Sequence, residues 1–238
     1  MVEGYHLGGP VWGLKDWLGI LFAPGSRPAE FLGQYASVFN AVEGNTTGYA
    51  IPTAESVARW RDATPESFQF CFKLPRIVTH QIRLRKHAQR HLDAFFEMMA
   101  PLGPRIGPWM IQLPPSFPPE DADILERFLR ALPPQWQYSV ELRHADLQPG
   151  QSAGDDVNLL LAELGMNRTV FDTRGLRDDD ALDPVVRDAQ RKKPNLPWTP
   201  IATGDRPTVR YCAHSDVPAN DDYLEFWAAQ VAAWIGEG

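Results

Sequence analysis

Cysteine is scarce in this sequence, and the two that it has, Cys71 and Cys212, lie far apart along the chain. They form no CxxC pair, and two cysteines are far fewer than a disulfide-built scaffold contains. We therefore predict that both thiols are reduced. Neither lies in a known nucleophile signature, so we interpret both as small buried residues.

Long apolar runs are also missing. No stretch approaches the roughly 18 to 20 apolar residues that are needed to span a bilayer, and no charged-then-apolar signal segment opens the chain. We predict a cytoplasmic protein that has no membrane partner.

An excess of positive charge is absent as well. The formal net charge of -7 argues against attraction of the whole protein to nucleic acid or to an anionic membrane, whereas a local basic cleft is compatible with it. No GxGxxG phosphate fingerprint accompanies Gly8 and Gly9. His87 and His91, in HAQRH, lack the glutamate of an HExxH metal site, and we interpret this pair as solvated surface.

The chain does contain strand-like and helix-like segments that alternate from one end to the other, which is typical of an α/β fold with a mainly parallel sheet. No linker divides it, so we predict a single domain over residues 1–238. The one long connection, 174–206, is rich in charge and proline, and we predict a flap with a short helix near 184–193. The predicted strands are 5–9, 38–43, 68–73, 106–113, 137–143, 168–173 and 208–214, and an eighth is compatible with the pattern.

Three apolar stripes have the 3.6-residue spacing of helices that pack on a core. The stripes are Ala88, Leu92, Phe95, Phe96 and Met99, then Ile124, Leu125, Phe128, Leu129 and Leu132, and finally Leu224, Trp227, Val231, Trp234 and Ile235.

Alternation within the strands indicates how the sheet is built, because successive side chains point to opposite faces. In FQFCFK, the three phenylalanines share one face, while Gln69, Cys71 and Lys73 share the other. QYSVELR and TVRYCAH repeat this arrangement. An open doubly wound sheet buries both faces and has continuous apolar strands. One apolar and one polar face instead predict a TIM-like (β/α) barrel of seven or eight parallel strands.

Nearly every predicted strand ends in a polar side chain, and the C-terminal ends of barrel strands are where such folds place their sites. We therefore predict one polar ring at this end. Its members are Glu43, Asn45, Lys73, Gln112, Glu141, Arg143, Asp172, Arg210 and His214, with His80 nearby. Trp12 and Tyr49 are candidates for walls on which a ring-shaped ligand stacks.

Several long motifs resemble the YecE-like family, whose TIM-barrel-like domain has no established reaction. They are GPVWG at 9–13, FLGQYASVFNAVEGNTTGY at 31–49, FQFCFKLPRIVTH at 68–80, QLPPSF at 112–117, VELRH at 140–144, KKPNLP at 192–197 and VRYCAHSD at 209–216. The resemblance covers nearly the whole chain and implies the fold but no activity. Gly48 stands where the family usually has an aromatic residue.

Four interpretations of the charged residues are compatible with the sequence. In the first interpretation, Glu43 and Glu141 form an acid/base pair for glycoside chemistry. Their strands, the second and the fifth, lie on nearly opposite sides of a barrel, which disfavours the short separation that this chemistry needs. In another, Glu43, Glu141, Asp172 and His214 hold a divalent metal, which the neighbouring bases disfavour. In the third, Lys73, Arg143 and Arg210 grip a phosphate or carboxylate. The fourth is a purely structural ion network.

We favour an enzyme that acts on a small polar, anionic and perhaps phosphorylated substrate. Glu43 or Glu141 would be its general acid or base, and the bases would stabilise negative charge. The alternative is a non-catalytic protein that binds nucleic acid or a protein partner with the same face, and the acidic net charge disfavours nucleic acid. A small-molecule ligand is the expected partner.

Overall fold

A computed structural model describes residues 4–85 and 88–237. The chain forms two compact units. Unit 1 comprises Met1–Ile111 and Pro133–Tyr138, and unit 2 comprises Gln112–Leu132 and Ser139–Gly238. All strand pairs are parallel, which confirms the predicted α/β class. The described residues form six strands, in sheets of two and four, rather than seven or eight.

Unit 1 contains a two-stranded sheet of β1 and β2, in register from Ala41 opposite Gln69 to Gly44 opposite Phe72. Single bridges continue from β2 toward β3, at Phe70 with Ile106 and Lys73 with Met110. The elements are η1 (Lys15–Trp17), η2 (Pro28–Glu30), α1 (Phe31–Ala36), β1 (Ala41–Gly44), η3 (Thr46–Gly48), α2 (Ala54–Asp62), β2 (Gln69–Phe72), the π-helical turn η4 (Ile77–Gln81), α3 (Ala88–Met99), η5 (Ala100–Arg105) and most of β3 (Trp109–Gln112).

The segment 5–9, predicted as the first strand, is not a regular strand. The N–H groups of Ala41 and Glu43 do donate to the carbonyls of Leu7 (3.2 Å) and Gly9 (3.0 Å). The segment's own N–H groups, however, donate to side chains: Leu7 to Asn40 Oδ1 (2.7 Å) and Gly9 to Tyr35 Oη (2.6 Å). Because the N–H groups of Leu7 and Gly9 donate to side chains, the segment lies along β1 without forming a regular ladder with it.

Aromatic rings fill the core of unit 1. Phe68, Phe70 and Phe72 have no exposed surface, as the alternation of FQFCFK predicts. Phe70 and Phe72 stack at 5.1 Å, and Trp60 of α2 and Trp109 of β3 extend the cluster at 5.3 and 6.2 Å from Phe72. Burying each phenylalanine contributes about 2 kcal/mol, so this face fixes the strand against its helices. Lys73, which directly follows β2, lies on the opposite, polar face of the strand.

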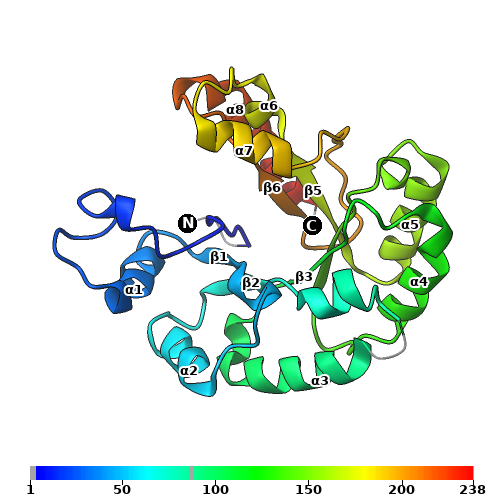
Figure 1. Cartoon of the computed structure of the whole chain (residues 1–238), viewed down its shortest axis with the longest axis horizontal. Coiled ribbons are helices and arrows are strands. Elements are labelled where there is room, and N and C mark those ends of the chain that lie inside the picture. Colours follow the sequence, from blue (N-terminus) through cyan, green and yellow to red (C-terminus); the bar gives the residue numbers. More distant parts are fainter. Residues whose placement is uncertain (1–3, 86–87, 238) are drawn as a thin grey trace. The chain divides into compact units, whose positions relative to one another are not determined.

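Unit 2 holds the end of β3 and a parallel sheet in chain order, β3-β4-β5-β6. The register places Ser139 opposite Asn167, and Asp172 opposite Tyr211. Helices α4 and α5 lie side by side (Figure 1). The elements are η6 (Pro119–Asp121), α4 (Ala122–Arg130), β4 (Tyr138–Glu141), η7 (Ala145–Leu147), α5 (Ser152–Glu163), β5 (Asn167–Asp172), α6 (Arg174–Asp178), α7 (Pro184–Lys192), β6 (Thr208–Tyr211), η8 (Pro218–Asn220) and α8 (Asp221–Glu237).

The three predicted helical stripes fare differently. All five stripe residues of α3 are buried, and so are four of the five in and just after α4. In α8, by contrast, Trp227 is the one buried member, and Leu224 and Ile235 are 52% and 42% exposed. The stripe therefore predicted the helix correctly but not its full burial. In the described part of the chain, no helix is long and apolar enough to cross a membrane.

The connection 174–206 contains α6 and α7, and α7 confirms the predicted short helix near 184–193. The two helices are tied together because Gln190 donates to the carbonyls of Leu176 (2.8 Å) and Asp179 (3.0 Å). Trp198 packs against Phe226 and Trp227 of α8 at 5.2 and 5.8 Å. The segment is thus packed on α8 within unit 2.

Close contact between segment 5–9 and β1 predicts a large difference between two glycines. A Cβ at Gly8 would lie 1.8 Å from the Ala41 carbonyl oxygen, whereas nothing lies within 4 Å of one at Gly13. We expect Gly8→Ala to lower the free energy of unfolding by about 2 kcal/mol. Gly13→Ala should leave it unchanged or raise it by up to about 1 kcal/mol. Urea denaturation of the two variants measures both, and equal stabilities would contradict the docking of this segment.

Candidate functional site

The charged cluster of unit 2 is centred on Glu141, the last residue of β4. Its side chain has no exposed surface. Oε1 accepts from Gln112 Nε2 (2.9 Å) and from Arg143 Nε in a short contact, and Oε2 accepts from Arg210 Nη1 (2.6 Å). The ends of β3, β4 and β6 thus bring four of the predicted residues together. A buried carboxylate needs such donors, because leaving it unpaired costs several kcal/mol.

Phe171 of β5 supports both guanidinium groups. The central carbons of Arg143 and Arg210 each lie 5.1 Å from the centre of its ring. The ring shares a strand face with Thr169, whose hydroxyl is hydrogen-bonded to Ser139 at 2.5 Å. Cation–π contacts of this kind contribute about 0.5 to 2 kcal/mol each. Phe171 therefore holds two like charges close together, and it was not among the predicted site residues.

Arg143 is anchored from one side only. Its Nε donates to Glu141, while its terminal nitrogens donate to no acceptor in residues 4–85 and 88–237, and its side chain is 16% exposed. The Arg210 side chain is similarly accessible, at 15%. A guanidinium group presents a planar fork of donors that matches two oxygens of a phosphate or carboxylate. The cluster can therefore present such a fork at a fixed position.

Asp172 does not join this cluster, contrary to the expectation that it shares the polar ring. Neighbouring Phe171 points to the Glu141 side of the sheet, so Asp172 points to the helices. There it accepts from Trp227 Nε1 of α8 (2.8 Å) and from Arg174 Nη2 (2.9 Å), with no exposed surface. Arg168, on the same face, is also buried and donates to Asn158 of α5 (2.9 Å). Asp172 therefore links the end of β5 to α8 and to the first residue of α6.

His214 likewise has local partners rather than Glu141. Its Nδ1 accepts from the Asp216 N–H (2.9 Å) and lies 3.6 Å from the Asp179 carboxylate. The backbone N–H of His214 donates to Asn220 Oδ1 (2.8 Å), and the side-chain amide of Asn220 donates to three backbone carbonyls of the same loop. The loop after β6 is thus organised around Asn220, a residue that no sequence motif indicates.

In unit 1, Glu43 is the residue before the last of β1, and Lys73 directly follows β2. The parallel register of the two strands brings these side chains together. Lys73 Nζ lies 3.4 Å from Glu43 Oε1, and their side chains are 16% and 13% exposed. Asn45 donates to the Pro10 carbonyl (2.8 Å), which ties the N-terminal segment to the loop after β1. His80 lies in η4, with its Nδ1 2.8 Å from Thr79 Oγ1.

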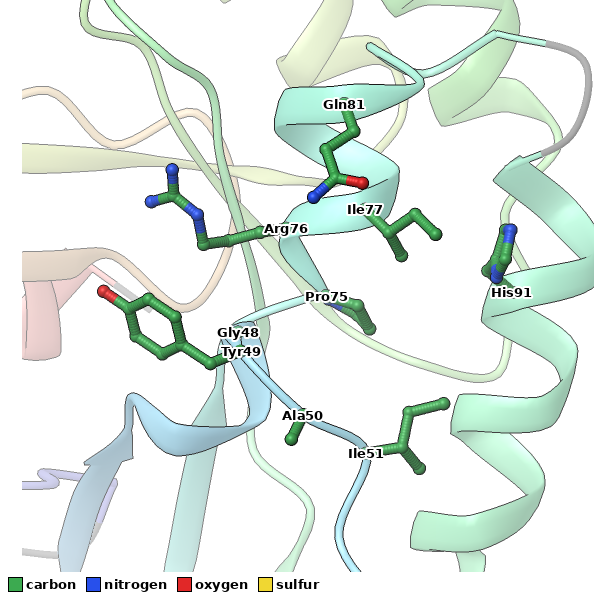
Figure 2. Close-up of a pocket in the computed structure, with 9 residues that line it drawn as sticks. All are labelled: Gly48, Tyr49, Ala50, Ile51, Pro75, Arg76, Ile77, Gln81 and His91. Atoms are coloured by element: carbon green, nitrogen blue, oxygen red, sulfur yellow. The ribbon is translucent and has the colours of Figure 1, made fainter.

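The two predicted aromatic walls have different surroundings. Trp12 packs edge-on against Trp60 and Phe70, at 5.6 and 6.2 Å, so its ring belongs to the aromatic core. Tyr49 is 80% exposed and lines a pocket of about 410 Å³ in unit 1 (Figure 2). His91 also lines this pocket and is half-buried. His87 lies outside the described residues.

The four residues considered as metal ligands each have other partners in their own unit. Throughout the described ranges, no group of three or more His, Cys, Asp or Glu side chains is arranged to hold a metal ion. Cys71 and Cys212 form no disulfide within the described residues, and both are partly exposed rather than buried as predicted.

These observations define a class: an α/β protein whose parallel strands end in charged side chains, with one buried carboxylate shared by two arginines. The family model "Protein of unknown function DUF72" matches residues 6–238, and the chain belongs to this family. It is similar to the UPF0759 protein YecE of Escherichia coli K12, with 36% identity over 229 residues, which are 96% of this chain and 81% of the relative. The YecE protein of E. coli O157:H7 is 35% identical over the same length.

Two solved structures share the fold. A DUF72 family protein from Thermotoga maritima has a TM-score of 0.67 and 25% identity, covering 89% of this chain and 75% of that one. A DUF72 family protein from Enterococcus faecalis has a TM-score of 0.63 and 22% identity, over 90% and 72% of the two chains. The resemblance to the YecE-like family is therefore confirmed.

The Glu141 cluster predicts a large cost for neutralising this one carboxylate. In Glu141→Gln, two guanidinium groups over one ring lose the charge between them, and we expect a loss of about 3 kcal/mol in the free energy of unfolding. Glu225→Gln, at an exposed position of α8, is the matched control and should stay within about 0.5 kcal/mol of wild type. Chemical denaturation followed by circular dichroism compares the two. Similar midpoints would mean that the cluster is not structural.

The hydrogen bonds to Asp179 predict that part of the free energy of unfolding is lost at acidic pH. Hydrogen bonds from the Ser215 hydroxyl and N–H and from the Ala181 N–H lower the pKa of Asp179 to about 2. Because this pKa is below the unfolded value of about 4, the carboxylate stabilises the fold above pH 4, and this contribution disappears as the pH falls toward 2. In Asp179→Asn, the stability should fall less steeply over this range, whereas Asp180→Asn should follow wild type. Parallel curves for all three proteins would refute the assignment.

Proposed function

We propose that this protein binds a small anionic ligand, through a phosphate or carboxylate group, on Arg143 and Arg210. The observation that carries the proposal is the accessible fork of Arg143, which Glu141 holds through Nε and Phe171 supports from below. Its terminal nitrogens are the kind of preorganised donors that bind an anion without first having to be ordered.

The roles within this site follow from the contacts. Glu141 is a positioning residue, because its oxygens already accept from three donors and a proton-transfer role would require breaking these bonds. Gln112 completes the set of donors to the carboxylate. Phe171 contacts both arginines, whose central guanidinium carbons each lie 5.1 Å from the centre of its ring, and it supplies an apolar floor. Glu141 therefore moves from the candidate catalytic residues to the support of the anion site.

We further propose that the protein is an enzyme, with Glu43 as its general acid or base. Glu43 is largely buried near the end of β1, 3.4 Å from Lys73 Nζ, so it places a carboxylate at a strand end, where a substrate proton can be transferred. The TIM-like (β/α) barrel and the single domain remain part of this proposal. Support for the barrel comes from the parallel strands, which are neighbours in chain order within each sheet. The cytoplasmic location stays a prediction from the sequence.

Inorganic phosphate and simple carboxylates test the anion site directly. Isothermal titration calorimetry should detect phosphate or citrate binding to wild type and at least tenfold weaker binding to Arg143→Gln, because a charge-assisted hydrogen bond contributes roughly 1.5 to 3 kcal/mol. Arg127→Gln, which removes the same charge from an exposed position of α4, should bind as wild type does. Equal affinities of both variants would refute the site.

The enzymatic part is tested separately. Ligands found by a thermal-shift screen of metabolite anions are incubated with wild type and with Glu43→Gln, and the mixtures are followed by proton and phosphorus NMR. Conversion by wild type that the variant loses supports an enzyme. A ligand that binds and is recovered intact supports the non-catalytic alternative.

A further inference from the structure

Unit 1 contains a pocket that none of the proposed roles uses. Its volume is about 410 Å³, which lies within the range of small-molecule sites. It is formed after the ends of β1 and β2, by residues 48–51, 75–77 and 81, with His91 of α3 on one side (Figure 2). The pocket thus lies at the C-terminal ends of two parallel strands, which is where α/β proteins usually bind ligands.

One part of the lining is apolar. Ile51, Pro75 and Ile77 face the space between the loop after β1 and α3, as Figure 2 shows. Ile51 is 45% exposed and the Tyr49 ring is 80% exposed. Exposed apolar side chains are common when isolated, but several that line one hollow provide a surface for the apolar body of a ligand.

The other part of the lining is polar, and its side chains are not hydrogen-bonded within the described residues. Arg76, Gln81 and His91 form no side-chain hydrogen bond or ion pair within the part of the chain that the structure describes. Arg76 instead makes a cation–π contact, in which its guanidinium carbon lies 5.7 Å from the centre of the Tyr49 ring. Three types of hydrogen-bonding group therefore surround the pocket without being used by the fold.

The charge of the lining determines what kind of ligand fits. Among the nine lining residues there is one arginine and no acid, although the chain carries a net charge of -7. A cation beside an aromatic ring attracts an anionic group and also permits a planar ring to stack, because guanidinium and aromatic faces both accept such stacking.

Gly48 adds a further feature of this wall. A Cβ at this position would be 3.8 Å from Lys73 Cβ and 3.9 Å from Arg76 Cγ, both ordinary contacts. The backbone therefore does not require glycine here, and the absence of a side chain leaves space beside Arg76.

We infer that this pocket binds a small molecule in which a planar ring carries one anionic group. The ring lies against the apolar wall of Ile51, Pro75 and Ile77, the anionic group accepts from Arg76 beside Tyr49, and Gln81 and His91 supply the remaining polar contacts. This binding function is separate from anion binding at Arg143, and it is carried by different residues in a different unit.

Four simple probes separate the parts of this ligand. They are phenyl phosphate and benzoate, which combine ring and anion, and inorganic phosphate and phenol, which each supply one part. Protein-observed NMR titration should show phenyl phosphate or benzoate binding at least about tenfold more tightly than phosphate or phenol, because ring and anion contacts add in one molecule. The preferred probe also distinguishes a phosphate from a carboxylate ligand.

Matched variants locate the binding. Arg76→Gln should weaken the preferred probe by about tenfold or more, whereas Arg90→Gln, at an exposed position of α3 outside the lining, should have no effect. Ile51→Glu places a carboxylate in the pocket and should abolish binding. Ile20→Glu, which makes the same change at a residue that is 85% exposed, should not. All four positions are at the surface, and the NMR spectra verify the fold.

Arg143→Gln keeps this inference distinct from the anion site and should bind the preferred probe as wild type does. The inference is overturned if no probe binds at about 10 mM, which corresponds to less than about 3 kcal/mol of binding free energy. It is equally overturned if Arg76→Gln and Ile51→Glu bind as wild type does, or if Arg143→Gln removes the binding.

Discussion

Glu141 has no exposed surface, and its two oxygens accept hydrogen bonds from Gln112, Arg143 and Arg210. These donors come from the ends of three strands, so one buried charge imposes a common position on β3, β4 and β6. The two guanidinium groups repel each other, and they stay close because the carboxylate lies between them and Phe171 lies beneath. The accessible fork of Arg143 exists because this arrangement needs only its Nε.

Much of the fold could be predicted from periodicity. The period of two in FQFCFK correctly assigned three phenylalanines to the core and Lys73 to the other face, because strand side chains must alternate. The period of 3.6 located α3 and α4. Partners were harder to predict. Segment 5–9 has a strand's composition, yet the side chains of Asn40 and Tyr35 take its donors. No local pattern encodes contacts between residues about 30 positions apart.

In the candidate site, the prediction was wrong by one residue, because it selected Asp172 and not its neighbour Phe171. Asp172 ends its strand as Glu141 does, but the register of β5 places Phe171 on the site face and turns Asp172 toward α8. A list of polar strand ends cannot detect this, since it ignores parity. Alternation applied to RTVFDT would have separated the two residues. The pocket around Tyr49 depends on loop conformations, for which the sequence offers no comparable rule.

Segment 5–9 also covers backbone groups of β1 through which unit 1 could pair with another copy. A strand that ends a sheet exposes a row of unpaired backbone groups, on which another copy can add a strand. Here the N–H groups of Ala41 and Glu43 are occupied by the segment, and the segment's own donors at Leu7 and Gly9 are occupied by Asn40 and Tyr35. The edge of β1 therefore ends in a short irregular strip whose hydrogen-bonding capacity is largely used within the molecule. Such a strip is a poor template for the addition of a strand from another copy.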